Sequence, residues 1–264
     1  MPELPEVETI VRQLRHKIVG KTILSLTIND KKVIDQFIPR ILPSKIISVH
    51  RTGKSIIIQL EQGHNLLIHL RMTGHFYHVT NPGDASYKKY LSGVFTLNNH
   101  FLLTFNEIRR FGSVRLFNDQ QLQQELSCLG PEPLEITSSE FVALLKEYPS
   151  AVIKTKLLDQ ACIAGIGNIY AQEMLFHAGI KPAHKIKDIS NHKLVKLHQE
   201  MQRILLLAIK NNGTTVENYS HLTGKGNFQN FLAVYGRDYC PGNHALEKIN
   251  LGGRGTSFCP QCQD

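Results

Sequence analysis

The sequence lacks several features that would place it outside the globular proteins. No stretch approaches the roughly 20 apolar residues that a membrane-spanning helix needs, so we expect no membrane partner. The opening residues, MPELPEVETI, contain neither a basic segment nor an apolar core, which excludes a secretory signal peptide. No low-complexity tract or internal repeat is present, so the chain is not a repeat array.

Cysteine and acidic residues are also scarce. The five cysteines are an odd number in a chain without an export signal, which favours reduced thiols and a cytoplasmic protein over a disulfide framework. Only 22 acidic residues face 30 lysines and arginines, so the net charge is +8 and the isoelectric point is about 9.2. This balance favours a polyanionic partner such as nucleic acid, and a basic protein without such a partner fits it equally well.

The first half of the chain reads as one helix followed by strands. At 264 residues, the chain is long enough for one large domain or two ordinary ones. Apolar residues recur at helical spacing over 5–18, which predicts a helix with one buried face. Between residues 22 and 118, strand-like runs alternate with Gly-, Asn-, Asp- and His-rich breaks, as in an antiparallel sandwich or barrel. The runs are TILSLTI, KIISVHR, SIIIQLE, NLLIHLRM, GVFTLN, FLLTFN and SVRLF.

The second half is helical and ends in a cysteine-bearing tail. LGPEPLEITSS, with two prolines, reads as a linker, and the runs EFVALLKEY, AVIKTKLLDQ, NIYAQEMLFHAG and NHKLVKLHQEMQRILLLAIK that follow it have helical character. We therefore predict an α+β protein in four parts. These are an N-terminal helix and β-sandwich domain at 1–128, a linker at 129–142, a helical domain at 143–233 and a small module at 234–264.

The tail has the spacing of a metal site. It reads Cys240-x3-His244, then fourteen residues, then Cys259-x2-Cys262. A Cys-x2-Cys turn directs two thiolates at one tetrahedral ion, and the first pair would complete a Cys3His zinc site, with free or redox-active thiols as the alternative. A module this small buries too little core to fold alone, so the metal would supply folding energy. NLGGRGTSF between the two halves predicts a β-hairpin with Arg254 at its tip, suited to phosphate.

Three internal motifs contain residue types that suit nucleic-acid contact. AGIGNIYAQE predicts a Gly-x-Gly turn and a helix opening at Asn168, whose N-terminus favours an anion; an ordinary turn capped by this asparagine is the alternative. HLRMTG and NEIRRFGSV place Met72, Arg109 and Phe111 beside strands, and such side chains fill gaps in a base stack. Taken singly, each fits an ordinary core or surface position. Lys54 in RTGKS lies at a strand entrance and is either functional or solvated.

The N-terminus supplies a candidate nucleophile. If Met1 is removed, Pro2 presents a secondary amine, and since an α-amine titrates near about 8, part of it is neutral at pH 7. Attack of this amine on carbon gives an iminium ion, which stays cationic and is an electron sink for elimination. Glu3 is placed to protonate a leaving group or sugar oxygen, and Glu6 to orient it. An ordinary acidic helix start is the alternative.

Four sequence blocks resemble the formamidopyrimidine-DNA glycosylase family, bacterial enzymes that excise oxidised purines from DNA. MPELPEVET, LGPEPL, AGIGNIYAQE and GRGTSFCPQCQ occur in the family's order over nearly the whole chain. The resemblance implies an N-terminal helix with a β-sandwich, a helix-two-turn-helix domain and a zinc finger. It also implies a monomeric glycosylase and abasic-site lyase, cytoplasmic and associated with the nucleoid, that binds damaged double-stranded DNA. One structural zinc and no small-molecule cofactor are expected.

The resemblance also implies a role for each candidate residue. It makes Pro2 the Schiff-base nucleophile at the sugar C1′, with Glu3 as proton donor and Glu6 beside it. Lys54 would lie on a β-hairpin and assist β-elimination, and Arg254 would bind phosphate and assist δ-elimination. The remaining candidates are Met72, Arg109 and Phe111, which would fill the space left by a flipped base, and Lys154 and Asn168, which would grip phosphates around the lesion.

The sequence departs from the family's pattern at several positions. Asn243 stands where the family has a second cysteine, so zinc binding rests on His244. Lys89 in KKYL stands where a DNA-contacting histidine is expected, and Thr155 replaces a proline that commonly follows Lys154. Pro2, Glu3 and Lys54 are intact, so the chemistry should survive.

Lesion preference is read from one residue and one loop. Leu4 favours the purine branch, because the related endonuclease VIII branch, which prefers oxidised pyrimidines, usually has Gly there. Residues 212–237 have the length of a loop that closes over oxidised guanine. The alternatives are an endonuclease VIII-like glycosylase for oxidised pyrimidines and a non-catalytic protein that binds lesions without cutting.

Overall fold

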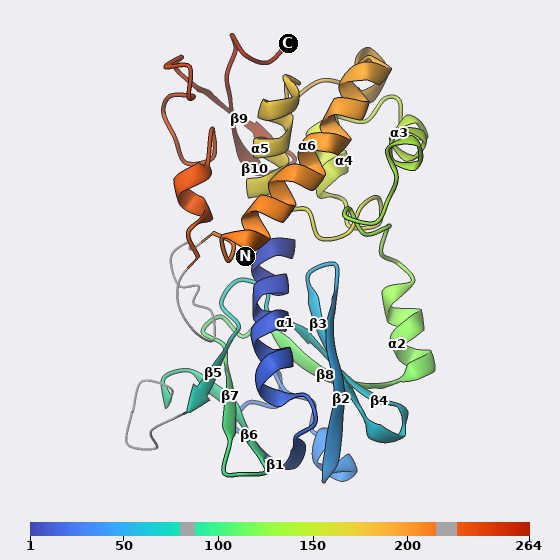
Figure 1. Cartoon of the computed structure of the whole chain (residues 1–264), viewed down its shortest axis with the longest axis vertical. Helices are drawn as coiled ribbons and strands as arrows, with labels where there is room; N and C mark the ends of the chain where they lie inside the picture. The colour runs from blue at the N-terminus through green and yellow to red at the C-terminus, as the bar shows by residue number, and fades with distance from the viewer. Residues whose placement is uncertain (80–87, 215–225) are drawn as a thin grey trace. The chain divides into compact units, whose positions relative to one another are not determined.

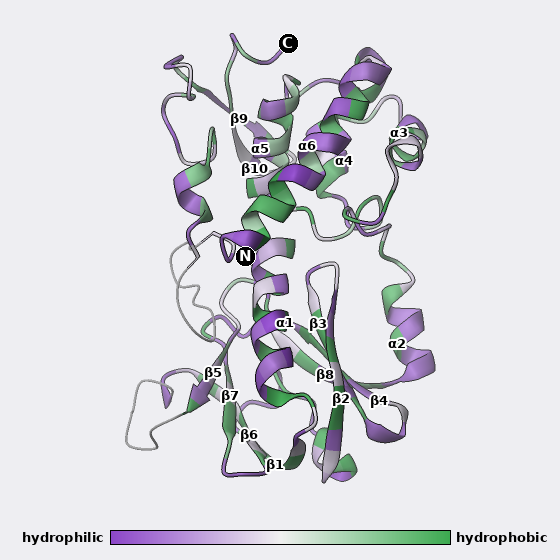
Figure 2. Ribbon diagram, viewed as in Figure 1, coloured by the Kyte–Doolittle hydropathy of each residue, from purple (hydrophilic) through white to green (hydrophobic). Residues whose placement is uncertain are grey.

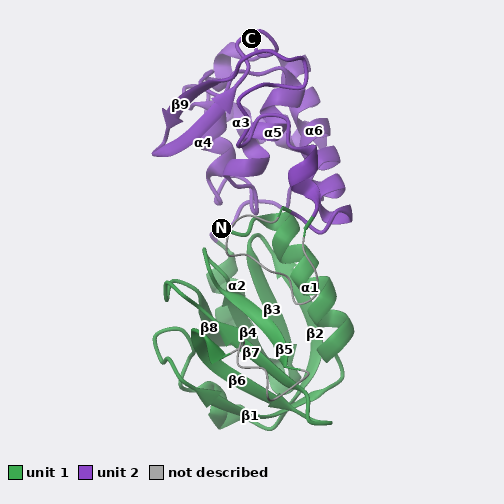
Figure 3. Ribbon diagram, turned by 90° about the vertical axis from the view of Figure 1, so that its left-hand side faces the viewer, with its two compact units in different colours: residues 1–127, 214–226 green, residues 128–213, 227–264 purple. Residues whose placement is uncertain are grey.

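The computed structural model describes residues 1–79, 88–214 and 226–264 (Figure 1). The chain forms two compact units (Figure 3). Unit 1 is Met1–Ser127 with Thr214–Gly226, and unit 2 is Cys128–Gly213 with Asn227–Asp264. Each unit has its own hydrophobic core.

Helix α1 (Leu4–Ile18) opens unit 1 and begins one residue before the predicted start. Glu3 is its N-cap, and Pro5 in the first turn costs nothing because its missing N–H would be unpaired there anyway. Helix α1 packs on the second and third strands of the sheet, where Arg15 Nε donates to the Val49 carbonyl over 3.0 Å. The predicted apolar face is buried: Val7, Ile10, Val11, Leu14 and Ile18 are at most 1% exposed.

Among the described residues of unit 1, eight strands form an antiparallel sheet in the order β5-β7-β6-β1-β2-β3-β4-β8. Strands β1 and β2 pair at only two positions, Thr22 with Lys45 and Ile23 with Ser44. The strands are β1 (Thr22–Ile28), β2 (Ser44–Thr52), β3 (Ser55–Leu60), β4 (His64–His69), β5 (His75–Val79), β6 (Leu91–Leu97), β7 (Leu102–Asn106) and β8 (Ser113–Asn118).

The two halves of this sheet face each other across one core. Side chains from both halves line the same small apolar cavity, for example Ile23 and Phe76 from one half and Ile58 and Ile68 from the other. The short β1–β2 pairing is therefore the corner of a sandwich, and the predicted β-sandwich is confirmed.

Two elements of unit 1 differ from the sequence prediction. Strand β5 lies in HFYHV, a stretch that we expected to be a His-rich break, and helix α2 (Asp119–Leu126) was not predicted. Strand β5 pairs along its whole length with β7, which supplies its hydrogen bonds. Helix α2 begins with a capping box in which Asn118 accepts from the Gln121 amide and the Gln121 side chain reaches back to the Asn118 amide.

Unit 2 is helical, as predicted, and ends in a two-stranded hairpin. The first turn of α3 falls within the expected linker, so residues 138–142 are helical. Figure 2 shows hydrophobic and hydrophilic residues interleaved along α6, and in the described parts of the chain no helix is long and apolar enough to cross a membrane. The elements are α3 (Ser138–Lys146), α4 (Ile153–Leu158), α5 (Asn168–Ala178), α6 (Asn191–Lys210), β9 (Glu247–Leu251) and β10 (Arg254–Phe258).

Candidate functional site

The start of α1 places two buried carboxylates directly behind Pro2. Pro2 is itself buried, and Glu3 and Glu6 are each 3% exposed. The Glu3 amide donates to Glu6 Oε2 over 2.8 Å, and the Thr214 amide donates to Glu6 Oε1 over 2.8 Å. Because each oxygen of Glu6 accepts a backbone N–H, this carboxylate is held in one orientation, next to the helix N-terminus that favours negative charge.

Lys54 lies in the turn of the β2–β3 hairpin and is 8% exposed. Gly53 before it has φ of 56°, a left-handed conformation that glycine adopts at little cost. Arg51 donates to the Gly53 carbonyl over 2.9 Å and pairs with Glu8 of α1 over 3.3 Å. The lysine therefore lies on a hairpin, as the resemblance implies, and that hairpin is tied to the helix that follows Pro2.

His69, at the end of β4, is a candidate that we did not single out from the sequence. It pairs across the sheet with Ser55, the residue after Lys54. Burial, then the charges of Arg71 and Lys54, lower the pKa of His69 to about 4, so the ring is neutral at pH 7. Nδ1 accepts the Arg71 amide over 3.1 Å, which leaves the ring proton on Nε2. Only the strand register reveals this position.

Met72, Arg109 and Phe111 lie on two turns of unit 1, with Met72 44% and Phe111 62% exposed. Arg109 Nη1 is 2.9 Å from Met72 Sδ, so the structure brings these two together, and Phe111 follows two residues later on the same turn. Singly exposed apolar side chains are common, so the feature that distinguishes this group is the proximity of the two turns. Buried Glu107 lies beneath both turns and accepts from the Arg109 amide over 3.0 Å.

The predicted hairpin in the tail is confirmed. Strands β9 and β10 pair antiparallel, with Glu247 opposite Phe258 at one end and Leu251 opposite Arg254 at the other. The turn between them is Gly252–Gly253, with φ of 58° and 73°, the left-handed pair that a two-residue hairpin turn requires. Arg254 follows this turn and is exposed.

Lys154 and Asn168 both contact β10. Lys154 is fully buried and donates to Thr256 Oγ1 over 2.6 Å, so in this state its ammonium group faces the hairpin. Asn168 Nδ2 donates to the Gly255 carbonyl over 3.2 Å. The N-cap of α5 is Gly167, so the alternative interpretation of Asn168 as the helix cap is wrong.

Gln172 of α5 is a further residue that the sequence did not single out. Its side chain is 1% exposed, accepts the Ser257 amide over 2.6 Å and donates to the Asn168 carbonyl over 2.8 Å. Together with Lys154 and Asn168, it holds β10, the strand that begins with Arg254.

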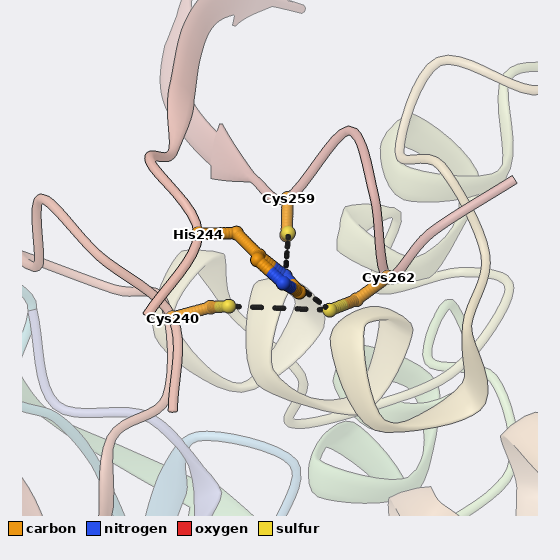
Figure 4. A group of neighbouring side chains, drawn as sticks. All are labelled: Cys240, His244, Cys259 and Cys262. Atoms are coloured by element: carbon orange, nitrogen blue, oxygen red, sulfur yellow. Dashed lines mark hydrogen bonds between the residues drawn. The ribbon is translucent and has the colours of Figure 1, made fainter. Parts of the chain in front are cut away.

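Cys240, His244, Cys259 and Cys262 come together as predicted (Figure 4). Their donor atoms all lie within 4.8 Å of one another, with Cys240 Sγ 3.9 Å from Cys262 Sγ and His244 Nδ1 3.3 Å from Cys262 Sγ. Tetrahedral zinc with bonds of about 2.1–2.3 Å sets donors about 3.5–3.8 Å apart, so the set fits one structural zinc with a histidine ligand. Hydrogen bonding to Cys259 is the largest cause that raises the pKa of Cys262 above its usual value.

Two further expectations lie at the edges of the described residues. Lys89 is exposed, with Nζ 5.2 Å from the centre of the Tyr90 ring, and its carbonyl accepts from Asn106 Nδ2 over 2.9 Å. The expected closing loop at 212–237 includes 215–225, which lie outside the described residues.

Comparison with known proteins finds similarity to formamidopyrimidine-DNA glycosylases along the whole chain. The formamidopyrimidine-DNA glycosylase N-terminal domain matches residues 1–114, the corresponding H2TH domain matches 129–220, and a zinc finger found in FPG and IleRS matches 242–264. Among curated proteins, the formamidopyrimidine-DNA glycosylase of Exiguobacterium sp. is 36% identical, across 100% of this chain and 99% of its own length. That of Shouchella clausii is 37% identical with the same coverage.

Solved structures agree with this similarity. A Lactococcus lactis FPG mutant bound to Fapy-dG-containing DNA has a TM-score of 0.92 at 32% identity and covers 100% of both chains. The Lactococcus lactis Fpg complex with abasic-site DNA has a TM-score of 0.92 at 32% identity, covering 99% of each chain. The MutM (FPG) protein from Thermus thermophilus has a TM-score of 0.87 at 33% identity, covering 99% of this chain and 98% of its own.

Proposed function

Because the chain belongs to the formamidopyrimidine-DNA glycosylase family, we propose that it removes oxidised purines such as 8-oxoguanine and formamidopyrimidines from duplex DNA and then cleaves the abasic site. The observation that supports this most directly is the arrangement at the start of α1. There, two buried carboxylates, one of them held by two backbone N–H groups, stand directly behind Pro2.

The proposed reaction begins when the Pro2 nitrogen attacks C1′ of the damaged nucleotide. The C1′–N bond to the base breaks, the base takes the electron pair and a proton, and the sugar opens to an iminium ion. Glu3 donates a proton to the ring oxygen, and Glu6 fixes the backbone of Glu3 through its hydrogen bond.

The iminium ion then supports two eliminations. Loss of a C2′ proton expels the 3′ phosphate, and a second elimination expels the 5′ phosphate, which leaves a one-nucleotide gap. Lys54, beside neutral His69, assists the first step, and Arg254 on the exposed hairpin turn assists the second. Water finally hydrolyses the iminium ion and regenerates the amine.

This chemistry needs a free Pro2 amine. An amide nitrogen has no lone pair available for attack, so Met1 must be removed, and the small residue at position 2 permits that. Intact-mass measurement of the purified protein should give the mass of the chain without Met1.

DNA contact is assigned to both units. In unit 1, Met72, Arg109 and Phe111 fill the space of the flipped base and Lys89 contacts the backbone. In unit 2, Lys154, Asn168 and Arg254 bind phosphates near the lesion, with one structural zinc supporting the hairpin that carries Arg254. We propose that the protein acts as a monomer on nucleoid DNA and uses no small-molecule cofactor. Leu4 supports the purine branch, because the endonuclease VIII branch usually has Gly at this position.

Borohydride trapping tests the proposal. A duplex with one 8-oxoguanine opposite cytosine should give a covalent adduct with the protein, and Pro2→Gly, which keeps an α-amine, should slow its formation. A duplex with thymine glycol should trap more slowly if the purine assignment is right. Binding without any adduct would favour the non-catalytic alternative, and unchanged trapping in Pro2→Gly would remove Pro2 from its role.

A further inference from the structure

The buried carboxylate of Glu107 is the common acceptor for the two turns that carry Met72, Arg109 and Phe111. Its side chain is 3% exposed. The Arg109 amide donates to Oε1 over 3.0 Å and the Gly112 amide donates to Oε2 over 2.9 Å. These bonds fix the turn over 107–112 at both ends.

The other turn, at 70–74, is tied to the same carboxylate. The Thr73 hydroxyl donates to Glu107 Oε1 and accepts from the Arg109 amide over 3.2 Å. Thr73, Glu107 and Arg109 therefore close a ring of hydrogen bonds between the turns. The Glu107 amide donates to the Tyr90 carbonyl over 3.0 Å, which anchors the backbone that carries the carboxylate.

Two glycines show how closely the chain wraps this group. A Cβ added at Gly112 would lie 2.3 Å from Glu107 Oε2, and one added at Gly74 would lie 3.1 Å from the same oxygen and 2.7 Å from the Leu70 carbonyl. A side chain at Gly112 would collide with the carboxylate and one at Gly74 would collide with the Leu70 backbone, so the chain passes close to Glu107 on both turns.

We propose that Glu107 is a positioning residue that fixes Met72, Arg109 and Phe111 before DNA is bound. This inference rests on the proposed function, in which those side chains enter the base stack. Ordering exposed side chains at the moment of binding costs conformational entropy, and turns fixed in advance lower that cost. A buried carboxylate is itself costly unless hydrogen-bonded, and here three donors satisfy it.

The experiment compares two substrates in single-turnover assays of Glu107→Gln. Glutamine has one acceptor oxygen, so its NH2 group must face a donor from one of the two turns. We expect excision of 8-oxoguanine to slow by about tenfold or more, while cleavage of a preformed abasic site, which has no base to displace, slows by less than about threefold. The fluorescence change of 2-aminopurine placed next to the lesion should slow with excision.

Matched variants separate positioning from general damage. Thr73→Val keeps the side-chain shape and removes the bridging hydroxyl. Like Glu107→Gln, it should slow excision of 8-oxoguanine more than cleavage of the abasic site. Glu61→Gln alters a carboxylate that accepts the Lys45 amide over 3.1 Å elsewhere in unit 1 and should leave both rates unchanged. In a Phe111→Ala background, Glu107→Gln should cause a smaller further loss than in the wild type, since part of its effect acts through the Phe111 side chain.

The outcomes distinguish this inference from the proposed function. Equal losses on both substrates, or full additivity of Glu107→Gln with Phe111→Ala, would refute the positioning role while leaving the glycosylase assignment intact. Wild-type protein that neither excises 8-oxoguanine nor cleaves an abasic site would refute the proposed function instead. If Glu107→Gln does not fold, as judged by its melting temperature, Thr73→Val decides the question on the same two substrates.

Discussion

Replacing His244 with alanine should strongly weaken zinc binding. The donor atoms of Cys240, His244, Cys259 and Cys262 lie within 4.8 Å of one another, and the histidine contributes the only nitrogen. Without it, three thiolates remain and water must fill the fourth position, an arrangement typical of catalytic rather than structural zinc sites.

The contribution of zinc to the folding of the module at 234–264 is large because the module buries few other side chains. Apart from the metal ligands, its buried apolar side chains are Val234 and Phe258. Burial of two such side chains contributes about 3–6 kcal/mol, whereas ordering even a few residues costs about 1–2 kcal/mol each in backbone entropy. Structural zinc in small fingers contributes about 10–16 kcal/mol. The metal is therefore the largest single contribution to the order of the module.

The assay is zinc content by mass spectrometry, followed by competition with a chromogenic chelator. Wild type should retain one zinc per chain. His244→Cys, which restores the four-thiolate set, should retain it too, and His192→Ala, an exposed histidine on α6, should match wild type. His244→Ala should lose zinc to the chelator at concentrations at least about 100-fold lower. Full zinc content in His244→Ala with an unchanged chelator profile would refute the assigned ligand set.

Three further predictions concern stability and DNA binding. The pKa of His69 is about 4 in the folded protein, below its unfolded value, so the unfolded state binds protons preferentially. The unfolding free energy should therefore fall by up to about 3 kcal/mol as pH drops from 6.5 to about 4, and His69→Gln should remove that dependence. Glu6→Gln leaves either the Glu3 or the Thr214 amide without its acceptor and should lower the urea-unfolding free energy by about 1–3 kcal/mol, whereas no change would show that these contacts are solvated. Lys154→Met should reduce the slope of log affinity against log salt by about 1 if this lysine binds phosphate, and an unchanged slope would leave it a purely structural partner of β10.

The helix and most strands could be predicted from period and length because each is encoded locally. Strand β5 could not, since HFYHV has two histidines and its hydrogen bonds come from β7, about 30 residues later in the chain. Helix α2 was not predicted because DQQLQQEL has only two apolar residues, Leu122 and Leu126, and only Leu122 is buried. Its start is set by the capping box of Asn118 and Gln121 instead.

The residues of the candidate site also divide into those marked by a local sequence pattern and those set by contacts between distant residues. The zinc ligands and the hairpin of Arg254 follow from spacing along the chain, whereas the role of Pro2 rests on the resemblance of MPELPEVET to the family. His69 and Glu107 act through strand register and turn contacts, and no local pattern marks them. Lys154 was predicted as a phosphate ligand, yet it is fully buried and donates to Thr256, a contact across 102 positions of sequence.

Helix α5 explains why the tail depends on more than its metal. Gln172 and Glu173 are consecutive, and both are 1% exposed, so α5 is buried on faces that point in different directions. Gln172 holds β10 through the Ser257 amide, and Glu173 accepts the amides of Ala233, Val234 and Tyr235 over 2.7–3.0 Å. Burial raises the pKa of Glu173 and these three amides oppose the rise.

Helix α5 thus holds both residues 233–235, which lead into the metal module, and strand β10, which follows the hairpin turn. Zinc closes the cluster of Cys240 and Cys262, while α5 fixes where the hairpin lies within unit 2. The two supports are separable, because Gln172 touches β10 and contributes no donor to the metal cluster. Loss of zinc should therefore disorder the cluster first, and loss of the Gln172 side chain should misplace Arg254 while zinc stays bound.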